Sequence, residues 1–138
     1  MATPETIHRE IIEAFNKRDF SKIRDMLHPD YTYTGGDGEE LSGPDAGVAV
    51  AQMYAQAFPD VRSELISTTA QGDRAVAEFR ARGTHNGELL GVGPTGKPVD
   101  VRVCNVVELR EGKIYREREY FDTATMWSQL GVTPPGRE

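Results

Sequence analysis

Residues 112–122, GKIYREREYFD, alternate between two kinds of side chain. The stretch begins with a glycine and is typical of a strand that leaves a tight turn and runs directly into a helix. Successive side chains on a strand point to opposite faces. One face carries Tyr115, Glu117, Glu119 and Phe121. The other face carries Ile114, Arg116, Arg118 and Tyr120. The face that meets the core therefore determines whether the chain buries carboxylates.

The preceding stretch, residues 99–109, indicates which face is buried. Its odd positions are almost all valine or leucine, interrupted only by Asn105. Its even positions include Asp100, Arg102 and Glu108. This pattern predicts a strand whose odd face lies against the core.

The turn between the two strands sets their register. Glu111-Gly112 lacks the Asn or Asp that favours a two-residue type I′ turn, so we predict a three-residue loop, 110–112, with Gly112 left-handed. Asn105 would then lie opposite Glu117, and the glutamates would point inward. A two-residue turn would instead place Arg116 and Arg118 beneath the valines, where unpaired charge is costly.

The rest of the chain predicts an α+β fold. Thr3-Pro4 is a helix start, with a threonine cap and proline in the first turn. Helices are expected at 4–15, 20–27, 44–58 and 123–130, a loop at 35–43, and strands at 31–34, 61–70 and 74–85. A curved, mostly antiparallel sheet around the N-terminal helices would form a cone. Small residues on one face of 74–85 would leave room inside it.

Length and composition limit the classes of function that are possible. The 138 residues suit a single domain spanning 1–138, and the net charge of −6 argues against a nucleic-acid partner. One cysteine, Cys104, excludes an internal disulfide and a thiolate metal cluster. No signal sequence or membrane-length apolar run is evident, so we expect a cytoplasmic protein without a membrane partner.

Two patterns that resemble ligand-binding sites each lack a feature that such a site requires. Residues 91–97, GVGPTGK, approach a phosphate-binding loop, but Pro98 replaces the required Ser or Thr and prevents the following helix. His8, His28 and His85 lie on three different predicted elements, without metal-ligand spacing. We therefore expect neither a phosphate-binding loop nor a metal site.

Six short motifs occur in order along the chain: His28-Pro29-Asp30-Tyr31, Phe58-Pro59-Asp60, Gly83-Thr84-His85-Asn86-Gly87, Pro94-Thr95-Gly96, Gly112-Lys113-Ile114 and Gln129-Leu130-Gly131. In these motifs the chain resembles the SnoaL-like polyketide cyclases and the broader ester cyclases. That resemblance implies the cone fold of nuclear transport factor two, ketosteroid isomerase and limonene epoxide hydrolase. It also implies cofactor-free intramolecular aldol closure by one acidic residue.

The resemblance places that acid, usually aspartate in the family, at Glu119. Two histidines of the characterised cyclases fall at Glu117 and Asn105, while His85 matches a third. As catalytic candidates we therefore take Glu119, Glu117 and His85. Two neighbouring carboxylates in an apolar cone would raise at least one pKa towards neutrality, as a general base requires. The alternative is a solvated ladder of Glu117 and Glu119 with the neighbouring arginines.

The remaining candidate residues each allow a functional and a structural interpretation. His85 is either a proton shuttle or a structural histidine bonded to a backbone carbonyl. Asn105 is expected to orient its neighbours, and Asp122 to cap the last helix. Six aromatic residues are candidate walls of a substrate pocket: Tyr31, Tyr33, Tyr54, Phe79, Tyr115 and Phe121. The alternative is that they are ordinary core residues, as most such aromatic residues are.

Two functions remain open. The leading prediction is a small-molecule enzyme that performs an aldol cyclisation, or a related isomerisation or hydrolysis, in a hydrophobic pocket. The alternative is a non-catalytic domain that binds a hydrophobic small molecule or a protein. The outward face of the last strands is apolar enough to predict a homodimer through the sheet: Arg102, Cys104, Val106 and Tyr120.

Overall fold

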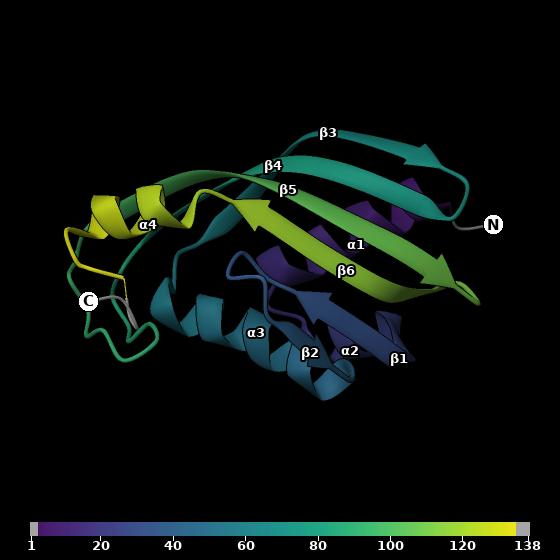
Figure 1. Cartoon of the computed structure of the whole chain (residues 1–138), viewed down its shortest axis with the longest axis horizontal. Helices are drawn as coiled ribbons and strands as arrows, with labels where there is room; N and C mark the ends of the chain where they lie inside the picture. Colours follow the sequence, from purple (N-terminus) through teal and green to yellow (C-terminus); the bar gives the residue numbers. More distant parts are fainter. Residues whose placement is uncertain (1–2, 135–138) are drawn as a thin grey trace.

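Helices cover one face of a six-stranded sheet in the computed structural model, which describes residues 3–134 (Figure 1). The sheet order is β2-β1-β6-β5-β4-β3. The helices are α1 (Pro4–Asn16), α2 (Phe20–Met26), α3 (Pro44–Ala57) and α4 (Thr123–Leu130). The strands are β1 (Leu27–Thr34), β2 (Glu40–Ser42), β3 (Arg62–Gln71), β4 (Arg74–Thr84), β5 (Pro98–Arg110) and β6 (Lys113–Phe121). The predicted α+β fold is confirmed.

The first helix begins where its sequence indicates. The Thr3 hydroxyl accepts from the backbone N–H of Thr6, and the Thr6 hydroxyl accepts from that of Thr3, with Pro4 in the first turn. Its apolar stripe packs Ile7 and Ala14 into a core cluster shared with β1, β4, β5 and β6. This packing holds α1 across the inner face of the sheet.

The β5–β6 turn differs from the prediction. Arg110 pairs with Lys113, so the turn has two residues and the predicted three-residue loop is wrong. Glu111 (φ 54°) and Gly112 (φ 76°) both adopt the positive φ that a type I′ turn requires. Glutamate is a rare residue there, but the turn matches the twist of the two strands.

A two-residue turn was expected to point Arg116 and Arg118 inward, but a β-bulge at Tyr115 prevents this. Leu109 pairs with Ile114, but Glu108 pairs with Arg116, which leaves Tyr115 as the extra residue on β6. The bulge lets the strand bury Ile114 and still point its glutamates inward. The arginines therefore do not face the core.

The bulge also changes the predicted cross-strand partners. Asn105 lies opposite Glu119, and Val107 lies opposite Glu117, so the predicted pairing of Asn105 with Glu117 is wrong. Arg118 points outward, where its guanidinium is 2.6 Å from a carboxylate oxygen of Glu108. The alternative of a solvated ladder with the arginines is thus excluded for the two glutamates.

The first two strands also extend beyond the prediction. β1 begins at Leu27 and runs parallel to β6, with an irregular register between Leu27 and Thr32. Pro29 lies within that irregular part, where a residue without an N–H is tolerated. β2 forms in the segment predicted as a loop and pairs antiparallel with β1. All three of its side chains are exposed, so no hydrophobic alternation marks it.

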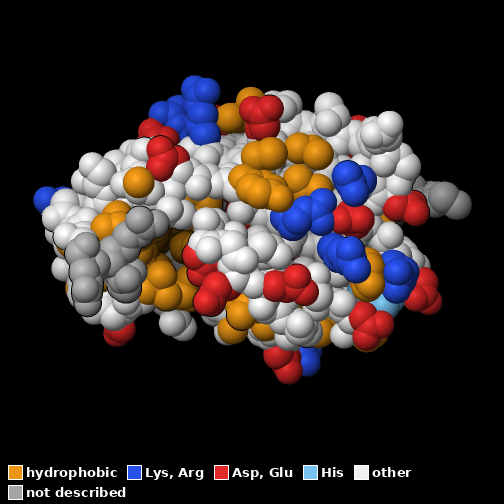
Figure 2. All heavy atoms as spheres, viewed as in Figure 1, with side chains coloured by type: hydrophobic (Ala, Val, Ile, Leu, Met, Phe, Trp, Pro, Cys, Tyr) orange, Lys and Arg blue, Asp and Glu red, His pale blue; other side chains and the backbone are white. Residues whose placement is uncertain are grey.

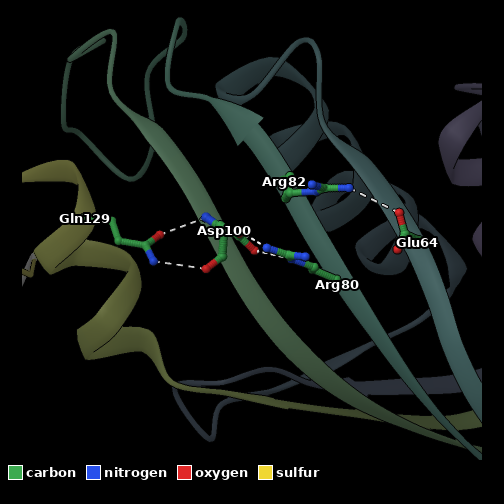
Figure 3. Close-up of polar contacts among 5 residues, drawn as sticks. All are labelled: Glu64, Arg80, Arg82, Asp100 and Gln129. Atoms are coloured by element: carbon green, nitrogen blue, oxygen red, sulfur yellow. Dashed lines mark hydrogen bonds and ion pairs between the residues drawn. The ribbon is translucent and has the colours of Figure 1, made fainter.

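The outer face of the sheet carries polar contacts (Figure 3). Arg80 on β4 bonds both carboxylate oxygens of Asp100 on β5, at 2.7 and 2.5 Å, and Arg82 reaches Glu64 on β3 at 3.1 Å. The Gln129 amide bonds the backbone N–H and C=O of Asp100, at 2.8 and 3.0 Å. These last bonds tie α4 to β5. α4 thereby packs at one end of the sheet (Figure 1).

Candidate active site

A cavity of about 170 Å³ lies between the helices and the inner face of the sheet. All four helices and strands β1 and β3–β6 contribute to its lining, which is mostly aliphatic and aromatic. Small inner side chains on β4 help to leave this space, since Ala75 and Ala77 are fully buried and Ala81 borders the cavity. The polar groups that border it are few: Tyr31, Tyr33, Tyr54, Ser63, Asn105, Glu117 and Glu119.

Glu117 and Glu119 project from β6 into this cavity as a hydrogen-bonded pair. The Asn105 amide donates to both carboxylates, at 2.8 Å to Glu117 and 3.0 Å to Glu119. The Tyr31 hydroxyl donates to Glu117 at 2.6 Å, and the Tyr33 hydroxyl donates to Glu119 at 3.2 Å. Each carboxylate therefore accepts from one tyrosine and from the shared asparagine.

The two tyrosines reach the pair from neighbouring β1. Tyr33 pairs with Glu117 in the parallel register, which brings both hydroxyls above the inner face of β6. Tyr31 also packs closely under α3, where a Cβ on Gly47 would lie 2.6 Å from its ring. Glycine at this helical position thus permits the ring to occupy its place. Burial and the nearby carboxylates raise the pKa of each tyrosine, so both remain protonated donors.

Burial in the cavity wall raises the pKa of both carboxyls. Burial, followed by the charge of Glu117, raises the pKa of Glu119 to about 7, although Asn105 and Tyr33 favour its ionised form. Burial also raises the pKa of Glu117, against the bonds from Tyr31 and Asn105. Glu119 therefore changes charge near neutral pH, which is the property of an effective general base.

His8 is part of this site, and sequence reasoning missed it. Its ring is fully buried, and Nε2 lies 2.8 Å from Oδ1 of Asn105. His8 lies beside Ile7 and three residues before Ile11, on the apolar stripe of α1, which predicts an inward side chain. That signal was present in the sequence. What the side chain would meet depends on how α1 crosses β5.

The predicted aromatic walls fall into two groups. Tyr33, Tyr54, Phe79 and Phe121 border the cavity, as does Tyr31. Tyr115, also predicted as a wall, does not border this cavity. At the bulge its ring lies against the guanidinium of Arg110, with 3.8 Å to the ring centroid, and packs edge-on against His28.

His85 is fully buried but does not line the cavity. Its Nδ1 accepts from the backbone N–H of Thr95 at 3.2 Å and lies 3.0 Å from the Thr95 hydroxyl. The ring packs against Phe58. The structure thus places His85 where it holds the connection between β4 and β5, away from the carboxylate pair.

Asp122 caps α4, as its position predicts. Its carboxylate accepts from the backbone N–H of Thr125 at 3.0 Å and from the Thr125 hydroxyl at 2.7 Å. Those two bonds lower the pKa of Asp122, so it stays ionised at neutral pH. Its role is structural, and it makes no contact with the pair on β6.

Within residues 3–134, no three side chains of His, Cys, Asp or Glu gather in a way that could hold a metal ion. Over the same part of the chain, no helix has the length and apolar character needed to span a bilayer.

Comparison with known proteins identifies the family of this chain. The model of the SnoaL-like polyketide cyclases matches residues 5–130. The chain belongs to the SnoaL-like polyketide cyclase family. Aklanonic acid methyl ester cyclase AcmA of Streptomyces galilaeus is 27% identical over 132 residues, which cover 94% of this chain and 92% of that protein. Nogalonic acid methyl ester cyclase of Streptomyces nogalater is 25% identical over 130 residues, or 93% and 97% of the two chains.

Solved structures of the family have the same fold. IdmH from Streptomyces antibioticus superposes with a TM-score of 0.81 at 29% identity, covering 95% of this chain and 100% of IdmH. A Xanthomonas campestris protein has a TM-score of 0.84 at 20% identity, covering 92% and 96% of the two chains, and supports the fold alone. The predicted SnoaL-like resemblance is therefore confirmed.

Proposed function

We propose that this SnoaL-like protein catalyses an intramolecular aldol cyclisation without a cofactor, with Glu119 as the general base. The observation that carries the proposal is a carboxyl with a pKa of about 7 on the wall of an apolar cavity. An ordinary glutamate, with a pKa near 4.5, would be a much weaker base towards the C–H next to a ketone. Membership of a cyclase family supports the same reaction.

In the proposed reaction, Glu119 removes a proton from the substrate and later returns it. The Glu119 carboxylate removes a proton from the carbon next to a substrate ketone, and the resulting enolate carbon attacks a second carbonyl carbon of the same molecule. A C–C bond forms, and the attacked carbonyl oxygen becomes an alkoxide. This oxygen takes the proton back from Glu119, which regenerates the carboxylate. Burial and then the neighbouring Glu117 keep the pKa of Glu119 high.

The lining favours a neutral substrate. No lysine, arginine or histidine of residues 3–134 borders the cavity, whereas two carboxylates do. A free carboxylic acid would bring a third negative charge into the same apolar space, and burying like charges is unfavourable. Methyl esters lack that charge. The relatives AcmA and the Streptomyces nogalater protein are named as cyclases of methyl esters.

The test is a size series of neutral methyl esters that carry two ketones, with aklanonic acid methyl ester as its largest member. The cavity volume of about 170 Å³ is below the usual range of pockets that enclose a drug-sized ligand, so the series begins with a single ring. We expect cyclised product of unchanged mass, without added metal or cofactor, and at a rate that rises as the pH passes about 7. The matching free acids serve as the control and should react more slowly.

One observation favours the alternative of a non-catalytic binding domain. Glu117 and Asn105 occupy positions where, by resemblance, the characterised cyclases carry histidines. Saturable binding of the esters, measured by calorimetry, with no cyclised product across the series would contradict the enzymatic proposal and support this alternative.

We also propose that the protein forms a homodimer through the outer face of the sheet. Cys104 pairs with Tyr120, and Val106 pairs with Val76, so apolar side chains adjoin across β4, β5 and β6. Tyr120 is 56% exposed. Figure 2 shows hydrophobic side chains gathered over β5 and β6, beside basic ones.

Light scattering at micromolar concentration should give the mass of a dimer. Tyr120→Asp should give a monomer, because it places a charge in the apolar patch. Lys17→Asp, which changes an exposed residue just after α1, should remain dimeric. A strictly monomeric wild-type protein would contradict the proposal.

A further inference from the structure

We propose that His8 is a positioning residue that fixes the amide of Asn105 in the one orientation that donates to both carboxylates of the site. The inference rests on the proposed function, because it deepens the role of the Glu117–Glu119 pair. Its test, however, does not require turnover.

The hydrogen bonds define the orientation of Asn105. Its Oδ1 is an acceptor, so the His8 Nε2 that lies 2.8 Å away must carry the proton. The two hydrogens on Nδ2 are used by Glu117, at 2.8 Å, and Glu119, at 3.0 Å. Every polar atom of this side chain therefore has a specific partner, and the partners come from α1 on one side and β6 on the other.

The opposite orientation of the amide is disfavoured both by the donor on His8 and by the acceptors on β6. If the amide turned over, Oδ1 would face two carboxylates and the NH₂ group would face a protonated nitrogen. Without the imidazole, only the bonds from Nδ2 to the two glutamates would orient the amide. The buried amide would also lack a donor for its oxygen, which is costly at a site only 3% exposed.

His8 supplies this bond without adding a charge. Burial lowers the pKa of its imidazole more than the bond to Asn105 raises it, so the ring is neutral at neutral pH. Asn105 is its polar partner, and Nδ1 has none within residues 3–134. An unpaired acceptor nitrogen is consistent with the Nε2–H form. A cationic side chain at the same place would instead favour ionised glutamates and lower the pKa of Glu119.

The test compares His8→Leu with His8→Gln. Leucine fills the space without a donor, whereas glutamine retains an N–H that can reach Asn105. The readout is the pKa of Glu119, followed by ¹³C NMR of glutamate side-chain carboxyls during a pH titration. We expect His8→Leu to raise this pKa by roughly 0.5–1 unit, since the Asn105 bond that favours the carboxylate is weakened. His8→Gln should remain within about 0.3 units of the wild type.

His85→Gln is the matched control, because His85 is equally buried but does not border the cavity. It should leave the pKa of Glu119 unchanged. An unchanged pKa in His8→Leu, or an equal shift in His85→Gln, would overturn the inference. The ¹⁵N shifts of the wild-type imidazole provide a test that needs no variant: they should report the Nε2–H tautomer, and the Nδ1–H tautomer would overturn the inference.

The outcomes separate the two proposals. A wild-type Glu119 that titrates near 4.5 would remove the proposed general base, whatever His8 does. A Glu119 that titrates near 7 in the wild type and in His8→Leu alike would leave the proposed base intact and remove the positioning role of His8.

Discussion

Glu119→Gln is expected to lower kcat for cyclisation by about 10²- to 10⁴-fold, the usual contribution of a general base. Glutamine has almost the same shape and can still bond Tyr33 and Asn105, but it cannot accept the substrate proton. The measurement is single-turnover formation of cyclised ester at pH 8. Asp122→Asn is the matched control, because asparagine also caps helices and Asp122 does not contact the carboxylate pair.

The same substitution should make the protein more stable above neutral pH. The pKa of Glu119 is about 7 in the folded protein and near 4.5 in an unfolded chain, so the folded state binds this proton more tightly. The contribution of Glu119 to the free energy of unfolding is therefore highest below about pH 4.5 and falls as the pH rises to about 7. Glutamine does not ionise, so Glu119→Gln should gain about 3 kcal/mol at pH 8, seen as a higher Tm.

The activity and the stability of Glu119→Gln together test whether Glu119 is the general base. Retained activity in Glu119→Gln would exclude Glu119 as the base. Lost activity with lower stability would instead mean that the substitution damages the fold, and the loss of rate could not then be assigned to proton transfer.

Asn105→Leu should have the second largest effect. It removes the donor shared by both carboxylates and leaves the buried Nε2–H of His8 without its acceptor. The pKa of Glu119 should rise above 7, since the bond from Asn105 holds it down. We expect cyclisation at pH 7 to fall by about tenfold or more, with part of the rate recovered at higher pH. Lost hydrogen bonds to charged groups should lower stability by roughly 2–4 kcal/mol.

Asn16→Leu provides the control for lost stability alone. The Asn16 amide bonds the backbone N–H and C=O of Ser63, both at 2.8 Å, and so clamps α1 to β3. Its loss should lower Tm without moving the pH midpoint of the rate. An unchanged pH midpoint in Asn105→Leu would contradict the assigned role of Asn105.

Local patterns in the sequence were sufficient for much of the fold. The alternation in 99–109 predicts which face of β5 is buried, and Val103, Asn105 and Val107 are indeed buried there. The caps at Thr3 and Asp122 predict where α1 and α4 begin. These features depend on neighbours within a few residues, so propensity and periodicity are enough. The inward direction of Glu117 and Glu119 was also predicted, although by a turn that does not form.

The detailed arrangement of the site depends on contacts between distant segments. The bulge at Tyr115 arises because β6 must bury Ile114 beside Leu27 of β1 and also pair with β5, and no local pattern contains both partners. For the same reason His85, which ends an inward-facing strand pattern, lies beside Thr95 and away from the cavity. His8 lies on a stripe that the sequence predicts to be buried. Only the packing of α1 across β5 brings it to Asn105, because the two residues are 97 positions apart in the chain.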